Sequence, residues 1–213
     1  MKVGVLGSGT VGQTLAAGFL KHGHEAMVGT REPAKLEDWQ KKNPKAKVGG
    51  FSETAAFGEV VVLAVKGSIA AEVLKSAGTK NLDRKLVMDA CNPIADAPPA
   101  NGVLQFFTAP NMSLMEQLQK EFPRTHLVKA FNSVGAGQMI NPAYKGGRPT
   151  MFICGNDNGA KATTAKILDR FGWETADMGK AESARAIEPL CMLWCVLGFT
   201  KNEWTHAFKL LRA

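Results

Sequence analysis

Three glycines near the start of the chain, Gly7, Gly9 and Gly12, follow an apolar strand pattern and open a helix pattern. In a G-x-G-x-x-G turn, Gly7 permits the sharp bend, Gly9 allows close approach to the backbone and Gly12 lets the helix pack on the strand. The unbonded amides at the helix start would face a phosphate group. We therefore predict that this segment holds the pyrophosphate of a dinucleotide, rather than being a glycine-rich turn without a ligand. The predicted contacts are Gly7, Ser8, Gly9, Thr10, Val11 and Gly12.

The end of the second predicted strand reads Gly29-Thr30-Arg31, with Glu32 one residue later. A site for NAD usually has a carboxylate at the strand end, which binds the ribose hydroxyls. The hydroxyl of Thr30 and the guanidinium of Arg31 suit a 2′-phosphate instead, because a guanidinium offers paired donors to phosphate oxygens. Lys35 would add positive charge one turn further on. The sequence therefore favours NADP(H) over NAD(H); the alternative is that Arg31 is an ordinary surface residue.

The remaining reactive residue types form no recognisable catalytic or metal-binding pattern. The four histidines lack a partner pattern of serine or aspartate, and the four cysteines include no C-x-x-C pair. Cys191 and Cys195 share one face of a predicted helix, where we interpret them as small buried side chains in a reducing compartment. We therefore assign no catalytic side chain and no metal ligand.

Strand and helix patterns alternate along the chain, and the apolar run 60–65 must be buried on both faces, as in a central parallel strand. The predicted strands are 2–6, 25–29, 47–49, 60–65, 86–90, 127–131, 150–154 and 173–177. The predicted helices are 10–22, 36–40, 69–76, 112–121, 159–171 and 181–211, with Pro189 opening a second helix in the last segment. This order predicts an α/β, Rossmann-type fold: a parallel sheet with helices on both faces and a small helical C-terminal part.

We expect residues 1–150 to form the NADP-binding Rossmann domain. Residues 151–213 would form a small C-terminal α/β extension that ends in helices, and the two parts would make one compact unit. The segment 92–111, rich in proline, is predicted to be a long functional or mobile loop. In the terminal helical region, i, i+3, i+4, i+7 spacing predicts a buried stripe. That stripe comprises Leu190, Leu193, Trp194 and Leu197.

The chain has 213 residues, of which 45% are hydrophobic and 21% charged, as in an ordinary globular protein. Its net charge of +7 is spread over small groups of lysine and arginine, without the long basic block of a nucleic-acid-binding tail. No apolar run approaches the length of a membrane helix. We expect a small-molecule substrate, no nucleic acid and no membrane partner. Because a strand pattern starts at once, we expect no signal peptide and a cytoplasmic location.

Two segments have a more specific pattern: Lys-Ala-Phe-Asn-Ser-Val-Gly at 129–135 and Glu-Pro-Leu-Cys-Met-Leu-Trp at 188–194. With the glycine turn, Gly29-Thr30-Arg31, Val-Leu-Ala-Val at 62–65 and Asp-Ala-Cys-Asn-Pro at 89–93, they make the chain resemble the NADPH-dependent coenzyme F420 reductases (F420:NADP oxidoreductases). The likeness spans nearly the whole chain. The reductase domains of the STEAP membrane metalloreductases, which use NADPH with a flavin, look similar.

This resemblance implies direct hydride transfer between NADPH and a deazaflavin (coenzyme F420) or flavin that stacks on it, without a catalytic side chain. We also expect a homodimer. The nicotinamide would lie near Val65, Asn92 and Phe131, and we also count Lys66 among the expected cofactor-binding residues. The second ring system would lie in a cleft between the C-terminal helices and four consecutive residues: Asn132, Ser133, Val134 and Gly135.

The identity of the acceptor stays open at this point, because the family commonly has proline or a bulky residue where this chain has Lys66. Lys66 could lie near the nicotinamide, contact a substrate anion or point to solvent. One alternative is an NADPH-dependent reductase of another small acceptor, since β-hydroxyacid dehydrogenases and pyrroline-carboxylate reductases share the glycine turn. Another is a redox sensor that binds NADP without turnover.

Overall fold

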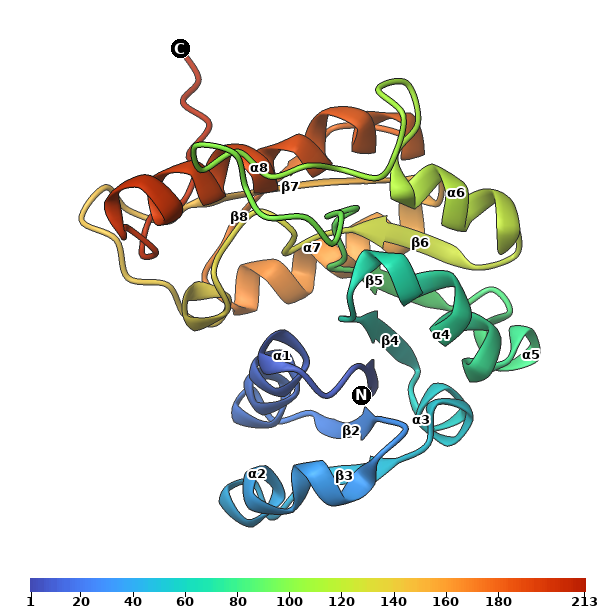
Figure 1. The fold of residues 1–213 in the computed structure, drawn as a ribbon. Helices are drawn as coiled ribbons and strands as arrows, with labels where there is room; N and C mark the ends of the chain where they lie inside the picture. The colour runs from blue at the N-terminus through green and yellow to red at the C-terminus, as the bar shows by residue number, and fades with distance from the viewer.

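Eight strands form one sheet in the order β3-β2-β1-β4-β5-β6-β7-β8 in the computed structural model, which describes residues 1–213 (Figure 1). The strands are β1 (Lys2–Leu6), β2 (Glu25–Gly29), β3 (Lys47–Gly49), β4 (Val60–Leu63), β5 (Leu86–Asp89), β6 (His126–Lys129), β7 (Thr150–Gly155) and β8 (Glu174–Asp177). The helices are α1 (Thr10–Lys21), α2 (Glu37–Lys42), α3 (Phe51–Phe57), α4 (Ala70–Ala77), α5 (Thr79–Leu82), α6 (Leu114–Glu121), α7 (Asn158–Arg170) and α8 (Ala184–Lys201). Short 3₁₀ turns lie at Pro33–Leu36, Gly67–Ile69, Ala136–Gln138 and Ala181–Ser183.

The predicted α/β, Rossmann-type fold is confirmed, since β1 to β6 have the order of a doubly wound dinucleotide-binding sheet. Neighbouring strands are parallel except β6 and β7, which are antiparallel. The expectation of a parallel sheet is therefore wrong for that one pair. No crossover helix is needed there, because the chain leaves the carboxyl end of β6 and enters β7 from the same edge of the sheet.

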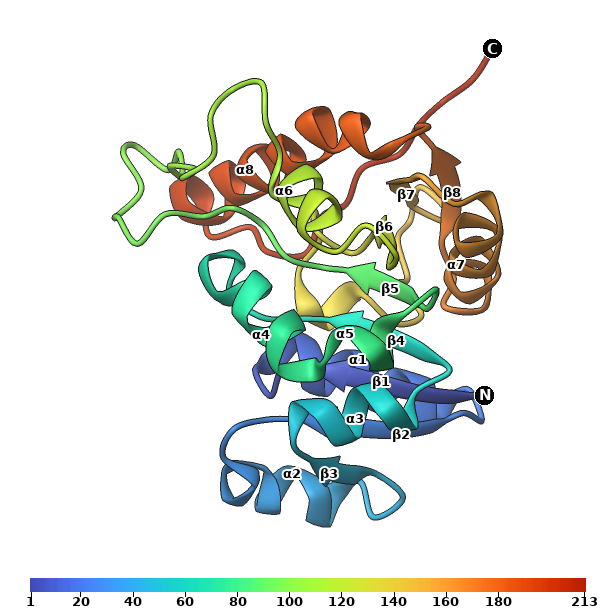
Figure 2. The same ribbon diagram turned by 90° about the vertical axis from the view of Figure 1, so that its right-hand side faces the viewer.

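Helices cover both faces of the sheet. Helices α1 and α7 pack on one face, where a cluster of buried side chains joins Leu15 and Phe19 of α1 to Leu168 of α7. Helices α3, α4 and α6 cover the other face, together with the first turns of α8 (Figure 2). The first cluster also includes Met151 and Ile153 of β7, so the core continues across residue 150.

The C-terminal region is one helix followed by an extended segment, which corrects the prediction of helices to residue 211. Helix α8 ends at Lys201, where Asn202 adopts a left-handed conformation with φ of +55°. The chain then turns back, so that the backbone amide of Thr150 donates to the carbonyl of Phe208. The ring of Trp204 lies against Gly198, where any larger side chain would overlap it. This tertiary contact holds the segment after Lys201 against α8, so the helix does not continue.

Pro189 lies inside α8. The prediction that it opens a second helix is therefore wrong. Pro189 stands on the exposed side of α8, where the carbonyl of Arg185 that its ring leaves unbonded can bond to water. The predicted buried stripe is also wrong, because Leu193 is 59% exposed. The buried stripe of α8 instead comprises Ile187, Glu188, Cys191, Trp194, Cys195 and Gly198.

The predicted loop exists and runs from residue 90 to 113 without helix or strand, apart from two isolated bridges. Figure 2 shows it beside α8, where Leu104 packs with Cys191, Trp194 and Cys195. The loop ends in a capping box, in which Ser113 and Glu116 bond reciprocally at the start of α6. A hydrogen bond from Arg185 lowers the pKa of Glu116 to about 2 and ties α6 to α8.

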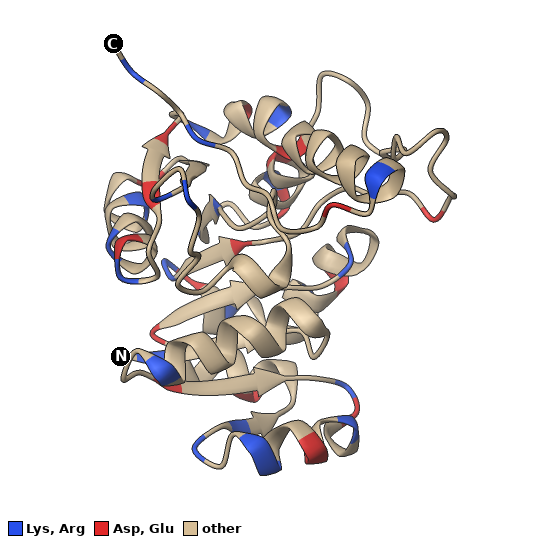
Figure 3. Cartoon of the chain, turned by 90° about the vertical axis from the view of Figure 1, so that its left-hand side faces the viewer, with Lys and Arg blue, Asp and Glu red and all other residues tan.

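The eight predicted strands are all present, most of them ending within two residues of the predicted positions. Helices α3 and α5 were missed. Both are short, and neither has a side-chain cap at its start, so the sequence offered no start signal. No helix of the structure is long and apolar enough to cross a membrane. Lysine and arginine are interspersed with aspartate and glutamate over the fold (Figure 3).

Candidate functional site

A cavity of about 490 Å³ opens at the carboxyl ends of β1, β2, β4 and β5. The residues that directly follow these four strands, Gly7, Thr30, Ala64 and Ala90, all line it. The sheet order reverses between β1 and β4, and ligands of such sheets bind at this reversal. The cavity therefore lies where the fold itself places a ligand site.

The glycine turn forms one side of the cavity, and its three glycines are needed for different reasons. A Cβ atom on Gly7 would lie 2.1 Å from the carbonyl oxygen of Ala64, and one on Gly12 would lie 2.0 Å from that of Gly7. Gly7 also has φ of +132°. A Cβ atom on Gly9 would meet nothing within 4 Å. Packing thus requires Gly7 and Gly12, whereas only a ligand would require Gly9.

Helix α1 starts at this turn without a side-chain cap, so its first amides are directed at the cavity unpaired by any side chain. The first turn of α1 contains no acidic residue. The dipole of the helix therefore favours an anion at this position. Four of the residues that we predict to contact a pyrophosphate line the cavity, namely Ser8, Gly9, Thr10 and Val11, whereas Gly12 packs beneath it.

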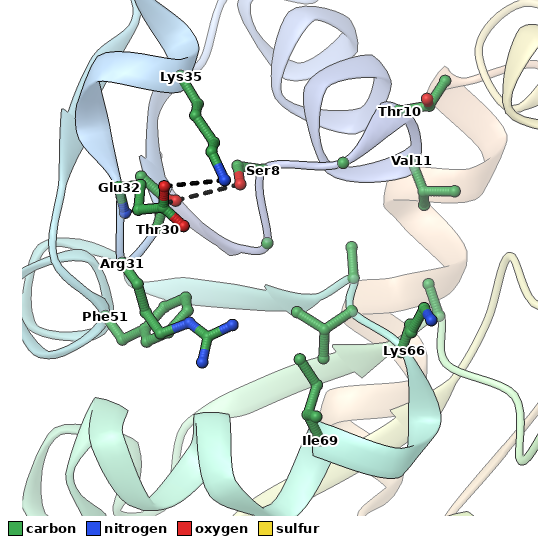
Figure 4. A pocket seen from close by; sticks show the side chains of 15 residues that line it. Ser8, Thr10, Val11, Thr30, Arg31, Glu32, Lys35, Phe51, Lys66 and Ile69 are labelled. Atoms are coloured by element: carbon green, nitrogen blue, oxygen red, sulfur yellow. Dashed lines mark hydrogen bonds and ion pairs between the residues drawn. The ribbon is translucent and has the colours of Figure 1, made fainter. Parts of the chain in front are cut away.

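The end of the cavity beside β2 is polar and carries positive charge (Figure 4). The Ser8 hydroxyl donates to Thr30 Oγ1 at 3.1 Å, and the backbone amide of Glu32 donates to the same oxygen at 3.1 Å. Lys35 Nζ lies 2.8 Å from Glu32 Oε2, and this hydrogen bond lowers the pKa of the Glu32 carboxyl. Glu32 therefore offsets much of the charge of Lys35.

Arg31 is exposed, lines the cavity and makes no hydrogen bond or ion pair through its side chain. In Figure 4 its guanidinium extends into the open space beside the ring of Phe51. Phe51 was not among the predicted site residues, because the short helix α3 that carries it has no start signal in the sequence. At this end of the cavity Arg31 is thus the positive side chain that no carboxylate contacts.

The other end of the cavity is lined mainly by apolar groups. Val65 and Ile69 follow β4, and Ala90 follows β5. Lys66 also lines this end, and its ammonium lies 3.3 Å from Asp96 Oδ1 on the long loop. Both side chains are mostly exposed, so solvent screens the pair and weakens it.

Two residues predicted near the nicotinamide lie outside the cavity lining. Phe131 is 1% exposed and packs in the core, with its ring centroid 6.2 Å from that of Phe171. Its φ of +63° is unusual for a bulky residue and turns the chain sharply after β6. Asn92 donates through Nδ2 to the carbonyl of Asn132. This hydrogen bond joins the turns that follow β5 and β6.

The segment predicted for the second ring system is covered in this structure. Asn132, Ser133 and Val134 are buried, and the side chain of Asn132 donates to the carbonyl of Ile187 and to Asn92 Oδ1. The rings of Trp194 and the backbone of Trp204 lie over Gly135. Contact between this segment and a second ring system would require Trp204 and its neighbours to move.

A buried group of charges lies beneath the same turns, and the sequence analysis did not assign it. Lys129 Nζ lies 2.6 Å from Asp89 Oδ2 and 2.9 Å from Glu188 Oε1, and none of the three side chains is more than 2% exposed. Burial by itself lowers the pKa of Lys129, but the charges of Asp89 and Glu188 outweigh burial and raise it. The two carboxylates therefore favour the charged form of Lys129.

The histidines and cysteines described next pack or bond within the protein and do not line the cavity. His22 Nε2 lies 3.1 Å from Asn141 Oδ1, and His206 stacks on Trp194. All four cysteines are buried free thiols, and burial raises the pKa of Cys91 and Cys154. No group of three or more histidine, cysteine, aspartate or glutamate side chains could hold a metal ion.

Comparison with known proteins assigns the family. The family model described as "NADP oxidoreductase coenzyme F420-dependent" matches residues 2–93. A protein of Arthrobacter sp. FB24, provisionally assigned as an F420-dependent NADP-reductase, is 34% identical, and its crystal structure superposes with a TM-score of 0.93 over 100% of both chains. This chain belongs to the F420-dependent NADP oxidoreductase family. The chain is therefore an NADP-dependent oxidoreductase.

Two further relatives of this oxidoreductase show how far the likeness extends. Metalloreductase STEAP3 of Rattus norvegicus is 30% identical over 89% of this chain, which spans 36% of the length of that relative. A hypothetical protein of Sinorhizobium meliloti, 23% identical, superposes with a TM-score of 0.72 over 86% of this chain and 87% of its own. At that identity the second similarity shows the fold alone.

The contrast between the glycines predicts that Gly9→Val abolishes NADPH binding in a folded oxidoreductase. The Cβ atom of the new side chain would enter the open space at the start of α1, with nothing within 4 Å of it. Gly12→Val is the matched control, and it should lower the melting temperature because its Cβ atom would overlap the Gly7 carbonyl. Fluorescence titration with NADPH and circular-dichroism melting measure the two effects. Normal NADPH affinity in Gly9→Val would contradict the assignment of this turn.

Proposed function

We propose that this oxidoreductase transfers hydride between NADPH and a deazaflavin (coenzyme F420) or a flavin-type acceptor. The observation that carries the proposal is the cavity itself, which joins an uncapped helix start and a free guanidinium to an apolar end. NADPH supplies a hydride from its nicotinamide, so that NADP⁺ forms while the acceptor gains the hydrogen with both electrons and takes one proton from solvent.

The polar end of the cavity fits the adenosine phosphate of NADPH. We assign the 2′-phosphate to the free guanidinium of Arg31 and to the hydroxyls of Ser8 and Thr30, which already lie 3.1 Å apart. Lys35 adds a weaker contribution, because its ammonium is paired with Glu32. The pyrophosphate is assigned to the amides at the start of α1, next to Gly9.

The apolar end fits the nicotinamide, beside Val65 and Ala90. Lys66 stands at the rim of this end and is available to an anionic group of the acceptor, since its pair with Asp96 is exposed. Asn92 and Phe131 lie in the turns that follow β5 and β6, and we propose that these turns border the nicotinamide. The segment from Asn132 to Gly135 is proposed to border the acceptor once Trp204 is displaced.

Catalysis in this proposal needs alignment rather than a proton-transferring side chain. None of the histidines lines the cavity, and the one carboxylate that does, Glu32, lies at the polar end and is paired with Lys35. Holding two rings at reaction distance replaces a bimolecular encounter with an oriented one. The apolar residues at the nicotinamide end would exclude water from that contact.

The free guanidinium predicts that Arg31 decides the choice of cofactor. A hydrogen bond to a charged group contributes about 1.5–3 kcal/mol, so Arg31→Ala should weaken NADPH binding at least about tenfold. NADH binding should hardly change, because NADH lacks the 2′-phosphate. Lys35→Ala, in which a paired charge is removed, should have a smaller effect. Titration of the three proteins with both cofactors tests this, and equal losses for NADPH and NADH would exclude Arg31 as the discriminator.

Direct transfer predicts that deuterium at the transferred position of NADPH appears on the reduced deazaflavin without loss to solvent. Each single histidine variant should keep turnover within about tenfold, because general acid–base catalysis contributes about 10²–10⁴-fold. Turnover is measured with the deazaflavin, FMN, FAD and ferric chelates as acceptors. Mass spectrometry of the reduced deazaflavin measures how much deuterium it carries. Loss of the label to water, or a folded, NADPH-binding histidine variant without activity, would favour a reductase of another small substrate.

We also propose that the protein is a homodimer through the exposed face of α8. From Ala186 to Thr200 the single charged residue of α8 is the buried Glu188. Leu193 and Phe199 are 59% and 47% exposed, and Val103 of the adjoining loop is 44% exposed. A helix that is apolar on all sides is normally buried. A charge-free face of this kind is complementary to a second copy of itself about a twofold axis.

The dimer proposal predicts that Leu193→Asp yields monomers, because two added carboxylates would face each other near the axis. Lys166→Asp on the exposed side of α7 is the matched control and should leave the dimer intact. Sedimentation velocity of the three proteins at equal concentration gives the answer. Dimers that persist in Leu193→Asp would place the interface elsewhere.

A further inference from the structure

The ammonium of Lys129 contacts three oxygen atoms. It lies 2.6 Å from Asp89, 2.9 Å from Glu188, and donates to the carbonyl of Cys91 at 2.9 Å. Asp89 and Lys129 are register partners in the neighbouring strands β5 and β6. Glu188 comes from α8, on the far side of this pair. Lys129, Asp89 and Glu188, the buried triad, therefore connect three elements at one point.

The same triad bonds to both ends of the loop from residue 90 to 113. At its start, Cys91 donates its amide to Asp89 Oδ1 and accepts from Lys129 through its carbonyl. At its end, the amides of Leu114 and Met115 donate to the two oxygens of Glu188. More than twenty residues of irregular chain are thus fixed at both ends by one cluster of charges.

Stability alone does not explain three buried charges, because taking ions out of water costs several kcal/mol each and apolar replacements are often as stable. The groups that the triad holds lie beside the cavity. Ala90, adjacent to Cys91, lines its apolar end, and Asp96 of the same loop contacts Lys66 there. The triad therefore determines where the loop stands relative to the nicotinamide end.

We propose that Lys129 is a positioning residue, which through Asp89 and Glu188 fixes both ends of the loop at the acceptor side of the cavity. The effect on turnover rests on the proposed function, in which the acceptor meets the nicotinamide at this end. The adenosine end, with Gly9 and Arg31, lies on β1 and β2 and does not contact the triad. We therefore expect loss of the triad to impair acceptor turnover much more than NADPH affinity.

Glu188→Gln is the first test variant. It keeps the volume of the side chain but removes the charge and one of the two acceptor oxygens at the start of α6. We expect hydrogen exchange of the loop amides to rise about tenfold or more, as a local opening. We expect kcat/KM for the acceptor to fall about tenfold or more, because small misplacements are costly in aligned reactions. The Kd for NADPH should change less than about threefold.

The control is Leu82→Ala, which removes a fully buried side chain next to the amino end of β5 and should lower the melting temperature without exposing the loop. Should Glu188→Gln not fold, the same measurements are made on Lys129→Met/Asp89→Asn/Glu188→Gln, which replaces all three charges by uncharged side chains. Unchanged loop exchange in a folded variant overturns the proposal, and so does equal loop exchange in Leu82→Ala. Failure of both triad variants to fold overturns it too, since the triad would then serve stability alone.

The exchange experiment requires no turnover, so it separates this inference from the proposed function. Suppose that the loop amides of the wild-type protein resist hydrogen exchange but the protein reduces no acceptor. That result would refute the proposed function, while the finding that the triad holds the loop would stand. Wild-type protein that is active, with a triad variant whose loop opens while acceptor kcat/KM stays unchanged, would refute the positioning role.

Discussion

The interaction of the Lys129 ammonium with two buried carboxylates is the constraint on which the acceptor side of this fold depends. It joins neighbouring strands of the sheet to α8, and through the oxygens of Glu188 it also holds the start of α6. An unpaired charge at this depth would be severely destabilising. The strands β5 and β6 and the helices α6 and α8 must therefore come together. Their contact fixes both ends of the long loop between β5 and α6, so that the loop can border a site of defined shape.

The other side of the cavity depends on backbone packing rather than on charge. Gly7 and Gly12 let β1, β4 and α1 approach closely enough for the helix start to reach the cavity. This close approach leaves space above Gly9 and directs unpaired amides into it. The single uncompensated guanidinium of Arg31 then adds the charge that distinguishes one dinucleotide from another. Rigid packing on this side and charge pairing on the other produce one cavity with chemically different ends.

Helix α8 has two roles that its sequence combines. One face contributes Glu188 to the buried triad and Trp194 to the cover over Gly135. The opposite face is apolar and exposed around Leu193. Because the same helix contributes to the cover of the acceptor side and to the proposed interface between copies, packing of a second copy on α8 would also steady that cover.

The sequence by itself determined where the strands lie along the chain, the glycine turn and the residues at the polar end of the cavity. These are local properties, since side-chain alternation, turn chemistry and the residue after a strand are read within a few positions. Gly9, Thr30 and Arg31 could therefore be assigned to the cavity in advance. Only the tertiary structure decided that Glu188 meets Lys129, that Phe51 lies beside Arg31 and that Trp204 covers Gly135. Each of these contacts joins segments far apart in the chain, and local periodicity carries no information about which distant side chain will fill a given space.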